Sequence, residues 1–134
     1  MSEILVDSNV ILDILTKDPQ WFDWSSQMVT NYANQGDLVI NPIIYAEIST
    51  GFNQPEEVEE ALPEDFFRRD PLPYSAAFLA GQSFLTYRQR GGIRRSPLPD
   101  FYIGAHATIA NIPLLTGDVN RYRTYFPVVQ LITP

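Results

Sequence analysis

Residues 4–15, ILVDSNVILDIL, contain the transition that decides the fold. Ile4, Leu5 and Val6 form an apolar run that is too short for a helix and is typical of a buried strand. After Asp7, apolar residues recur at helical spacing, at positions 10, 11, 14 and 15. The stretch therefore predicts a buried strand that gives way to a helix at Asp7.

The rest of the chain continues this alternation of short apolar strands and helices. Further strands are predicted at 38–40, 114–115 and 128–132, and helices at 19–36, 42–51, 55–62, 76–92 and 100–110. Pro97 and Pro99 make the approach to the last helix irregular. Short apolar strands between helices favour an α/β fold with a largely parallel sheet.

Length and composition restrict the class of protein further. A chain of 134 residues can bury a core without covalent help, so we expect one domain over residues 1–134. The absence of cysteine excludes a disulfide framework, a thiolate zinc site and a cysteine nucleophile. The single histidine, His106, excludes a multi-histidine metal site, and we expect it to be structural. No apolar run approaches the ~18 residues of a membrane span, and the N-terminus lacks a basic leader, so we expect a cytoplasmic protein with no membrane partner.

The net charge of −7 is unevenly distributed. An acidic surface repels phosphate, which argues against a nucleic-acid partner. Residues 71–99, however, contain no acid and carry four arginines directly before Asp100: Arg88, Arg90, Arg94 and Arg95. These arginines are candidates for contacts with an RNA backbone. Favourable placement of cations at a helix end explains them equally well.

Four acids lie at positions where the predicted elements begin or end. Asp7 and Asp118 each follow a buried strand, Asp100 opens a helix, and Glu47 lies within an otherwise apolar helix. Four carboxylates in one pocket raise one another's pKa and need a counterion. Hard oxygen ligands suit Mg²⁺ or Mn²⁺. Two such ions about 4 Å apart activate water and stabilise the leaving oxygen in phosphodiester hydrolysis.

Each acid also has a purely structural explanation. Asp7 and Asp100 are both suited to cap the helix that follows, and Asp118 has the surroundings of a turn. Glu47 among apolar neighbours either faces solvent or has a buried partner. The residues after Asp7 weigh against two other classes. A receiver domain needs adjacent acids after the first strand and a lysine late in the chain, whereas here Ser8 follows Asp7 and the only lysine is Lys17. A haloacid-type phosphatase needs an Asp at the position that Asn9 occupies.

The four acid-bearing segments, taken in order, resemble the PIN-domain ribonucleases. The segments are LVDSNVIL, IIYAEI, PDFYIGAHA and LLTGD, and the length and ending are similar to the VapC-type toxins of toxin–antitoxin pairs. The resemblance implies a three-layer α/β/α sandwich with a short, mostly parallel central sheet. It implies Mg²⁺- or Mn²⁺-dependent cleavage of RNA, with Asp7, Glu47, Asp100 and Asp118 as catalytic metal ligands. Asn9 and Thr116 match polar positions that support those ligands in the family.

The resemblance also implies protein partners. These are a cognate antitoxin that blocks the site and a second copy of the chain in a homodimer. Trp21 and Trp24, on a predicted helix near the N-terminus, are candidate antitoxin contacts. Gly104 replaces a usual Ala, and Asn120, followed by Tyr122, stands where many members place an aromatic nearer the last Asp. The alternative function is a PIN-fold module that binds RNA or protein without cleavage.

Overall fold

A computed structural model describes residues 2–134 of the chain. Its elements follow one another as β1 (Ser2–Val6), α1 (Ser8–Leu15), α2 (Phe22–Ala33), β2 (Gly36–Ile40), α3 (Pro42–Ser49), α4 (Pro55–Ala61), β3 (Phe67–Arg69), α5 (Tyr74–Gln89), α6 (Pro99–Ala110), β4 (Leu114–Leu115), α7 (Asn120–Tyr125) and β5 (Leu131–Ile132). Among these helices, none is long and apolar enough to cross a membrane.

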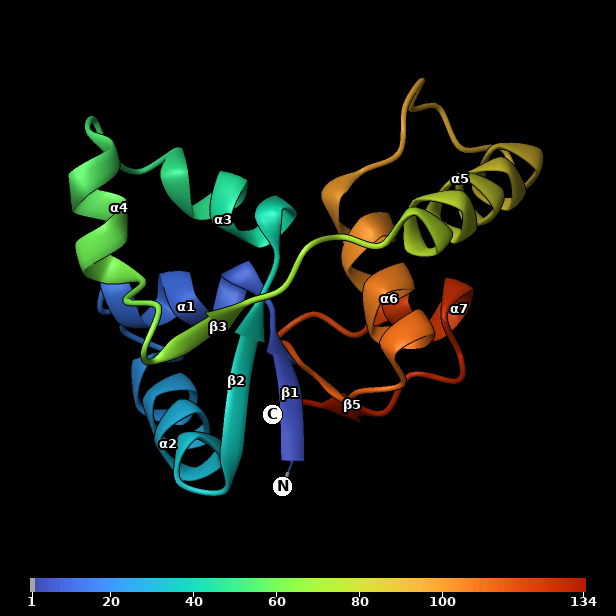
Figure 1. Ribbon diagram of the computed structural model, residues 1–134. Coiled ribbons are helices and arrows are strands. Elements are labelled where there is room, and N and C mark those ends of the chain that lie inside the picture. The colour runs from blue at the N-terminus through green and yellow to red at the C-terminus, as the bar shows by residue number, and fades with distance from the viewer. Residues whose placement is uncertain (1) are drawn as a thin grey trace.

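The strands form one sheet in the order β3-β2-β1-β4-β5, and every pairing is parallel. Helices α1 to α4 lie on one side of the sheet and α5 to α7 on the other, as Figure 1 shows. The predicted three-layer α/β/α sandwich is confirmed. The chain moves from β1 outward to β2, and later returns to pair β4 with the other side of β1. Ligand crevices in such sheets lie at this switch point, outside the carboxyl ends of the strands.

Local signals explain where the helices next to this crevice begin. The Asp7 carboxylate caps α1 by accepting from the amide of Ser8. Asn41 caps α3 by accepting from the amide of Ile44 at 2.9 Å. In α6, Leu98 holds the cap position, so the alternative role of Asp100 as a helix cap is wrong. Asp100 instead lies in the first turn, where the helix dipole favours a negative charge.

The structure contains two elements that the apolar periodicity did not predict, β3 and α7, and its last strand is shorter than predicted. Strand β3 has the sequence FRR, and it pairs with β2 because Phe67 is buried and Arg68 is tied to acids around it. Helix α7, NRYRTY, has too few apolar residues to show a period. The last strand is limited to Leu131–Ile132, because Val128 is 78% exposed and does not join the sheet.

An aromatic cluster joins α5, α6 and α7 on one face of the sheet. Phe101 is fully buried and packs against the rings of Tyr87, Tyr125 and Phe126. Gly104 belongs to this contact, since a Cβ there would lie 2.4 Å from the Phe126 ring. The absence of a side chain at Gly104 therefore makes room for the Phe126 ring.

Candidate active site

Asp7 is the centre of the polar network at the carboxyl end of β1. It is 4% exposed, and its backbone amide donates to the carbonyl of Leu115 on β4 at 2.9 Å. Its Oδ2 accepts from the hydroxyls of Thr116, at 2.9 Å, and Tyr122, at 2.8 Å. Burial raises the pKa of the Asp7 carboxyl, and these hydrogen bonds oppose the rise only in part. The structure thus confines an acid in surroundings that disfavour its negative charge.

Asn9 and Thr116 connect the ends of β1 and β4 through side-chain hydrogen bonds. The Asn9 amide donates to the Thr116 hydroxyl at 3.2 Å and to Oδ2 of Asp7 at 3.4 Å. The Asn9 carbonyl oxygen accepts from the amide of Gly117 at 3.0 Å. The Thr116 hydroxyl in turn accepts from the amide of Asp118 at 3.1 Å. Both side chains therefore orient acids of the candidate site.

Glu47 reaches the same region from α3. Its Oε1 accepts from the hydroxyl of Ser8 at 2.8 Å, and the side chain is partly buried. Burial raises the pKa of Glu47, and the charges of Asp7 and Asp100 raise it further. Glu47 lies among apolar residues in the sequence. Its carboxylate is accommodated there by a polar partner, Ser8, rather than by pointing into solvent.

Asp100 and Asp118 lie on the α6 and α7 side of the site. Burial raises the pKa of Asp100, the neighbouring Arg121 lowers it, and the charge of Asp118 raises it. Asp118 is exposed and accepts from the amide of Asn120 at 3.2 Å, which confirms the turn expected there. Both acids line a pocket of about 440 Å³ between α5, α6 and α7.

The chemistry of these donors fits a divalent cation. The charge of Asp100 raises the pKa of Asp7, and the charges of both raise the pKa of Glu47. All three are oxygen ligands of the kind that Mg²⁺ and Mn²⁺ prefer. Within residues 2–134, however, no three Asp, Glu or His side chains form the ligand set of a single ion. Closing such a set requires movement of these side chains toward one another.

The other predicted contacts lie outside this network. The four arginines of residues 88–95 are exposed at the end of α5 and in the loop that follows. Arg88 donates to the carbonyl of Arg94 at 2.6 Å, and the Arg90 guanidinium lies 5.5 Å from the centre of the Tyr125 ring. Trp21, at the start of α2, is 37% exposed, and Trp24 is partly buried against the core. The structure places none of these residues against Asp7.

His106 has the expected structural place. It is buried, and its Nδ1 lies 2.9 Å from the side-chain nitrogen of Asn41, the residue that caps α3. Burial lowers the pKa of the ring. The contact joins α6 to the start of α3 across the end of β2.

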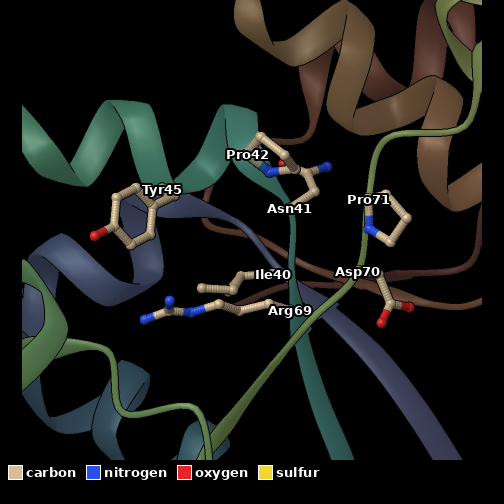
Figure 2. Close-up of a pocket in the computed structure, with 7 residues that line it drawn as sticks. All are labelled: Ile40, Asn41, Pro42, Tyr45, Arg69, Asp70 and Pro71. Carbon is tan, nitrogen blue, oxygen red and sulfur yellow. The ribbon is translucent and has the colours of Figure 1, made fainter.

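A second pocket, of about 360 Å³, lies at the ends of β2 and β3 and is drawn in Figure 2. The Arg69 side chain extends below the Tyr45 ring, whereas the Asp70 carboxylate points away from it. Glu59 and Glu64 pair with Arg69, and Arg68 pairs with Asp70. The charges of this pocket are thus matched within the protein, unlike those around Asp7.

Three residues of the candidate site were missed by the sequence analysis as functional: Ser8, Arg121 and Tyr122. Ser8 follows Asp7 directly and is the first residue of α1. Arg121 and Tyr122 lie on α7, which the apolar pattern did not predict. The signal that could have found Arg121 and Tyr122 is their position three and four residues after Asp118, a candidate ligand.

Comparisons with known proteins agree with this architecture. The family model described as the PIN domain matches residues 4–127. VapBC2 from Rickettsia felis bound to a promoter DNA fragment contains a chain with 18% identity and a TM-score of 0.72, covering 98% of each chain. VapBC-1 from nontypeable Haemophilus influenzae gives 19% and 0.72, covering 98% of this chain and 97% of that one. FitAcB from Neisseria gonorrhoeae gives 21% and 0.64, covering 96% of each. No curated protein matches the sequence.

Proposed function

The chain belongs to the PIN-domain family, and from that premise we propose that it is a metal-dependent endoribonuclease, the toxin of a type II toxin–antitoxin pair. PIN domains are generally nucleases, which supports a hydrolase acting on nucleic acid. Residues 1–134 would act as a single nuclease domain. The observation that carries the proposal is the buried Asp7 at the switch point between β1 and β4. It lies near Asp100, whose charge raises the pKa of Asp7, and near Glu47, whose pKa the charge of Asp7 raises.

We assign Asp7, Glu47, Asp100 and Asp118 as the residues that would hold Mg²⁺ or Mn²⁺. A bound divalent cation supplies a nucleophilic water near neutral pH and offsets negative charge on the phosphate in the transition state. Hydroxyls of Thr116 and Tyr122 fix the orientation of the Asp7 carboxylate. Metal binding requires the carboxylates to lose their protons. The raised pKa values of the buried acids thus make binding weaken as the pH falls.

An RNA cleavage assay tests this proposal. Purified protein is incubated with single-stranded RNA in Mg²⁺, Mn²⁺ or EDTA, alongside Asp7→Asn and Glu47→Gln. The matched controls are Asp23→Asn and Glu56→Gln, which make the same changes at exposed helix positions. We expect cleavage only with metal, loss by at least about 100-fold in the site variants, and normal rates in the controls. Cleavage that persists in EDTA or in both site variants contradicts the proposal.

The alternative function, RNA or protein binding without cleavage, shares the fold and makes a different prediction. An inactive module would bind RNA without cutting it under any metal condition. Capping α1 explains one oxygen of the Asp7 carboxylate, but the burial that raises its pKa beside Glu47 and Asp100 favours the nuclease, because groups with perturbed pKa values cluster at catalytic sites. The same assay, with binding measured beside cleavage, distinguishes the two.

An antitoxin partner is supported by an apolar pocket of about 570 Å³ between α1, α2 and the segment from α4 to β3. Leu15 and Phe66 line it and are 40% and 45% exposed. Trp21 and Trp24 do not line this pocket, so their proposed contact would lie beside it. If a small protein is encoded in the neighbouring reading frame, its co-expression with this chain, followed by co-purification, tests the partner. Leu15→Glu should abolish the complex while the toxin remains folded.

A homodimer is supported by the outer face of α5. Tyr74, Phe78 and Leu85 are 95%, 70% and 51% exposed and fall on one stripe of the helix, with the small Gly81 between them. No charged residue lies between 71 and 87, so a second copy with the same net charge meets no repulsion there. Sedimentation should report a dimer that Phe78→Glu dissociates. Ile93→Glu, at an 86% exposed loop position, should leave the dimer intact.

A further inference from the structure

Arg121 is the one cation within residues 2–134 that pairs with any of the four candidate ligands. Its Nη1 lies 3.4 Å from Oδ1 of Asp100. Charge-assisted hydrogen bonds of this kind are usually about 2.7–2.9 Å long, so the contact is a loose one. The position of the guanidinium therefore needs another explanation.

Two aromatic rings hold the guanidinium in place. It lies 5.3 Å from the centroid of the Tyr87 ring and 5.3 Å from that of Phe101. Cations at such distances are attracted to the ring faces. Phe101 is fully buried within the aromatic cluster, so this support is rigid. Arg121 is consequently fixed by packing, and its hydrogen-bonding capacity is left for another group.

That capacity is large and faces the candidate active site. A guanidinium has five N–H donors, and the described residues take one of them, through Asp100. Arg121 lines the pocket of about 440 Å³ together with Asp100 and Asp118. The next residue, Tyr122, is buried and donates to Asp7, which anchors α7 at this edge of the site.

We propose that Arg121 binds a phosphate of the RNA backbone in this pocket, beside the carboxylates assigned to the metal. The inference rests on the proposed function. A planar guanidinium presents paired donors that match two phosphate oxygens. The four arginines of residues 88–95 do not pair with these acids, whereas Arg121 connects the acids to the pocket. It supplies the local positive charge that an acidic protein needs next to a polyanionic substrate.

The same placement has an opposite consequence for the metal. A fixed positive charge next to Asp100 repels a divalent cation that shares this carboxylate. Replacing Arg121 by a neutral residue should therefore strengthen metal binding and weaken RNA binding. A residue that only stabilised the fold would not move these two affinities in opposite directions.

The test compares Arg121→Gln with Arg123→Gln, which removes the same charge from an exposed position on the same helix. RNA affinity is measured by fluorescence anisotropy with a short single-stranded RNA in Ca²⁺, and a gel verifies that the RNA stays intact. Metal affinity is measured by calorimetry with Mn²⁺. For Arg121→Gln we expect about tenfold weaker RNA binding, a salt dependence reduced by roughly 0.7 in log–log slope, and roughly threefold tighter Mn²⁺ binding. Arg123→Gln should match wild type.

Equal RNA affinity and salt slope in wild type and Arg121→Gln would overturn the inference, as would the same loss in both variants. If Arg121→Gln is unstable, Arg121→Lys decides. It keeps the charge and loses the paired donors, so the wild-type salt slope with a severalfold weaker affinity supports the phosphate contact, and wild-type affinity overturns it. If RNA binding depends on Arg121 but the protein cleaves no RNA, the nuclease proposal is refuted and the phosphate contact stands. If the protein cleaves RNA but its RNA affinity does not depend on Arg121, the phosphate contact is refuted and the nuclease proposal stands.

Discussion

Tyr122→Phe removes a single hydroxyl and leaves the ring in the core. That hydroxyl donates to Oδ2 of Asp7 at 2.8 Å, and Tyr122 is 2% exposed, so water cannot replace the bond. A hydrogen bond to a charged group contributes about 1.5–3 kcal/mol, and one between neutral groups about 1 kcal/mol. We therefore expect a loss of about 1.5–3 kcal/mol when Asp7 is ionised, and a decrease in Tm of roughly 5–12 °C for a domain of this size.

The pH dependence of this loss follows from the same contact. The Tyr122 hydroxyl stabilises the ionised carboxylate and so opposes the effect of burial, which raises the pKa of Asp7 above its ordinary value of 3.8. The difference between wild type and variant should be largest above the folded-state pKa of Asp7, and should shrink as the pH falls through it.

Thermal unfolding in EDTA, followed by circular dichroism at pH 8 and at lower pH, measures both effects. The matched control is Tyr45→Phe, which removes a hydroxyl that donates to Glu59 at 2.6 Å on the surface. We expect a much smaller change there, because solvent replaces the lost bond. Equal losses for Tyr122→Phe and Tyr45→Phe would refute the role assigned to burial in holding Asp7.

Three further predictions concern stability and packing. Asp7→Asn in EDTA should gain stability relative to wild type as the pH rises. The buried Asp7 contributes most to stability below its unfolded-state pKa, and this contribution is lost as the pH rises through its raised folded-state pKa. A difference in urea midpoints that does not change with pH would contradict this. Gly104→Ala should cost about 1–3 kcal/mol, because its Cβ would lie 2.4 Å from the Phe126 ring, and an unchanged Tm would be inconsistent with the packing described. Gly81→Ala, which meets nothing within 4 Å on α5, should stabilise by about 0.5–1 kcal/mol, and a lower Tm would show that the position is not open.

The sequence allowed the layered α/β fold to be predicted because its buried strands are short apolar runs between amphipathic helices. It did not reveal β3, where ion pairs of Arg68 with Asp37 and Asp70 replace the usual apolar pattern. The Arg68–Asp37 pair joins residues far apart in the sequence, and the Arg68–Asp70 pair joins residues two positions apart that no apolar period marks. Strand β3 lies at the edge of the sheet, where charged side chains prevent pairing with other chains. The same charges remove the apolar pattern by which a strand is predicted.

The candidate site was predictable to a similar extent. The position of Asp7 after the first strand is visible in the sequence, and so is its role as a helix cap. The donation from Tyr122, 115 residues further along the chain, is not, because it depends on how α7 packs against the sheet. Arg121 was overlooked because the cluster at residues 88–95 is conspicuous in sequence, whereas aromatic support from Tyr87 and Phe101 exists only in the folded chain.

The metal assignment is tested most directly by locating Mn²⁺ through its anomalous scattering in crystals of the wild-type protein. We predict a peak at the carboxyl ends of β1 and β4, within ligand distance of the Asp7 and Asp100 carboxylates, and its loss in crystals of Asp7→Asn. A peak elsewhere, or one at the same place that survives Asp7→Asn, would contradict the proposal that these buried acids hold the cation for RNA cleavage.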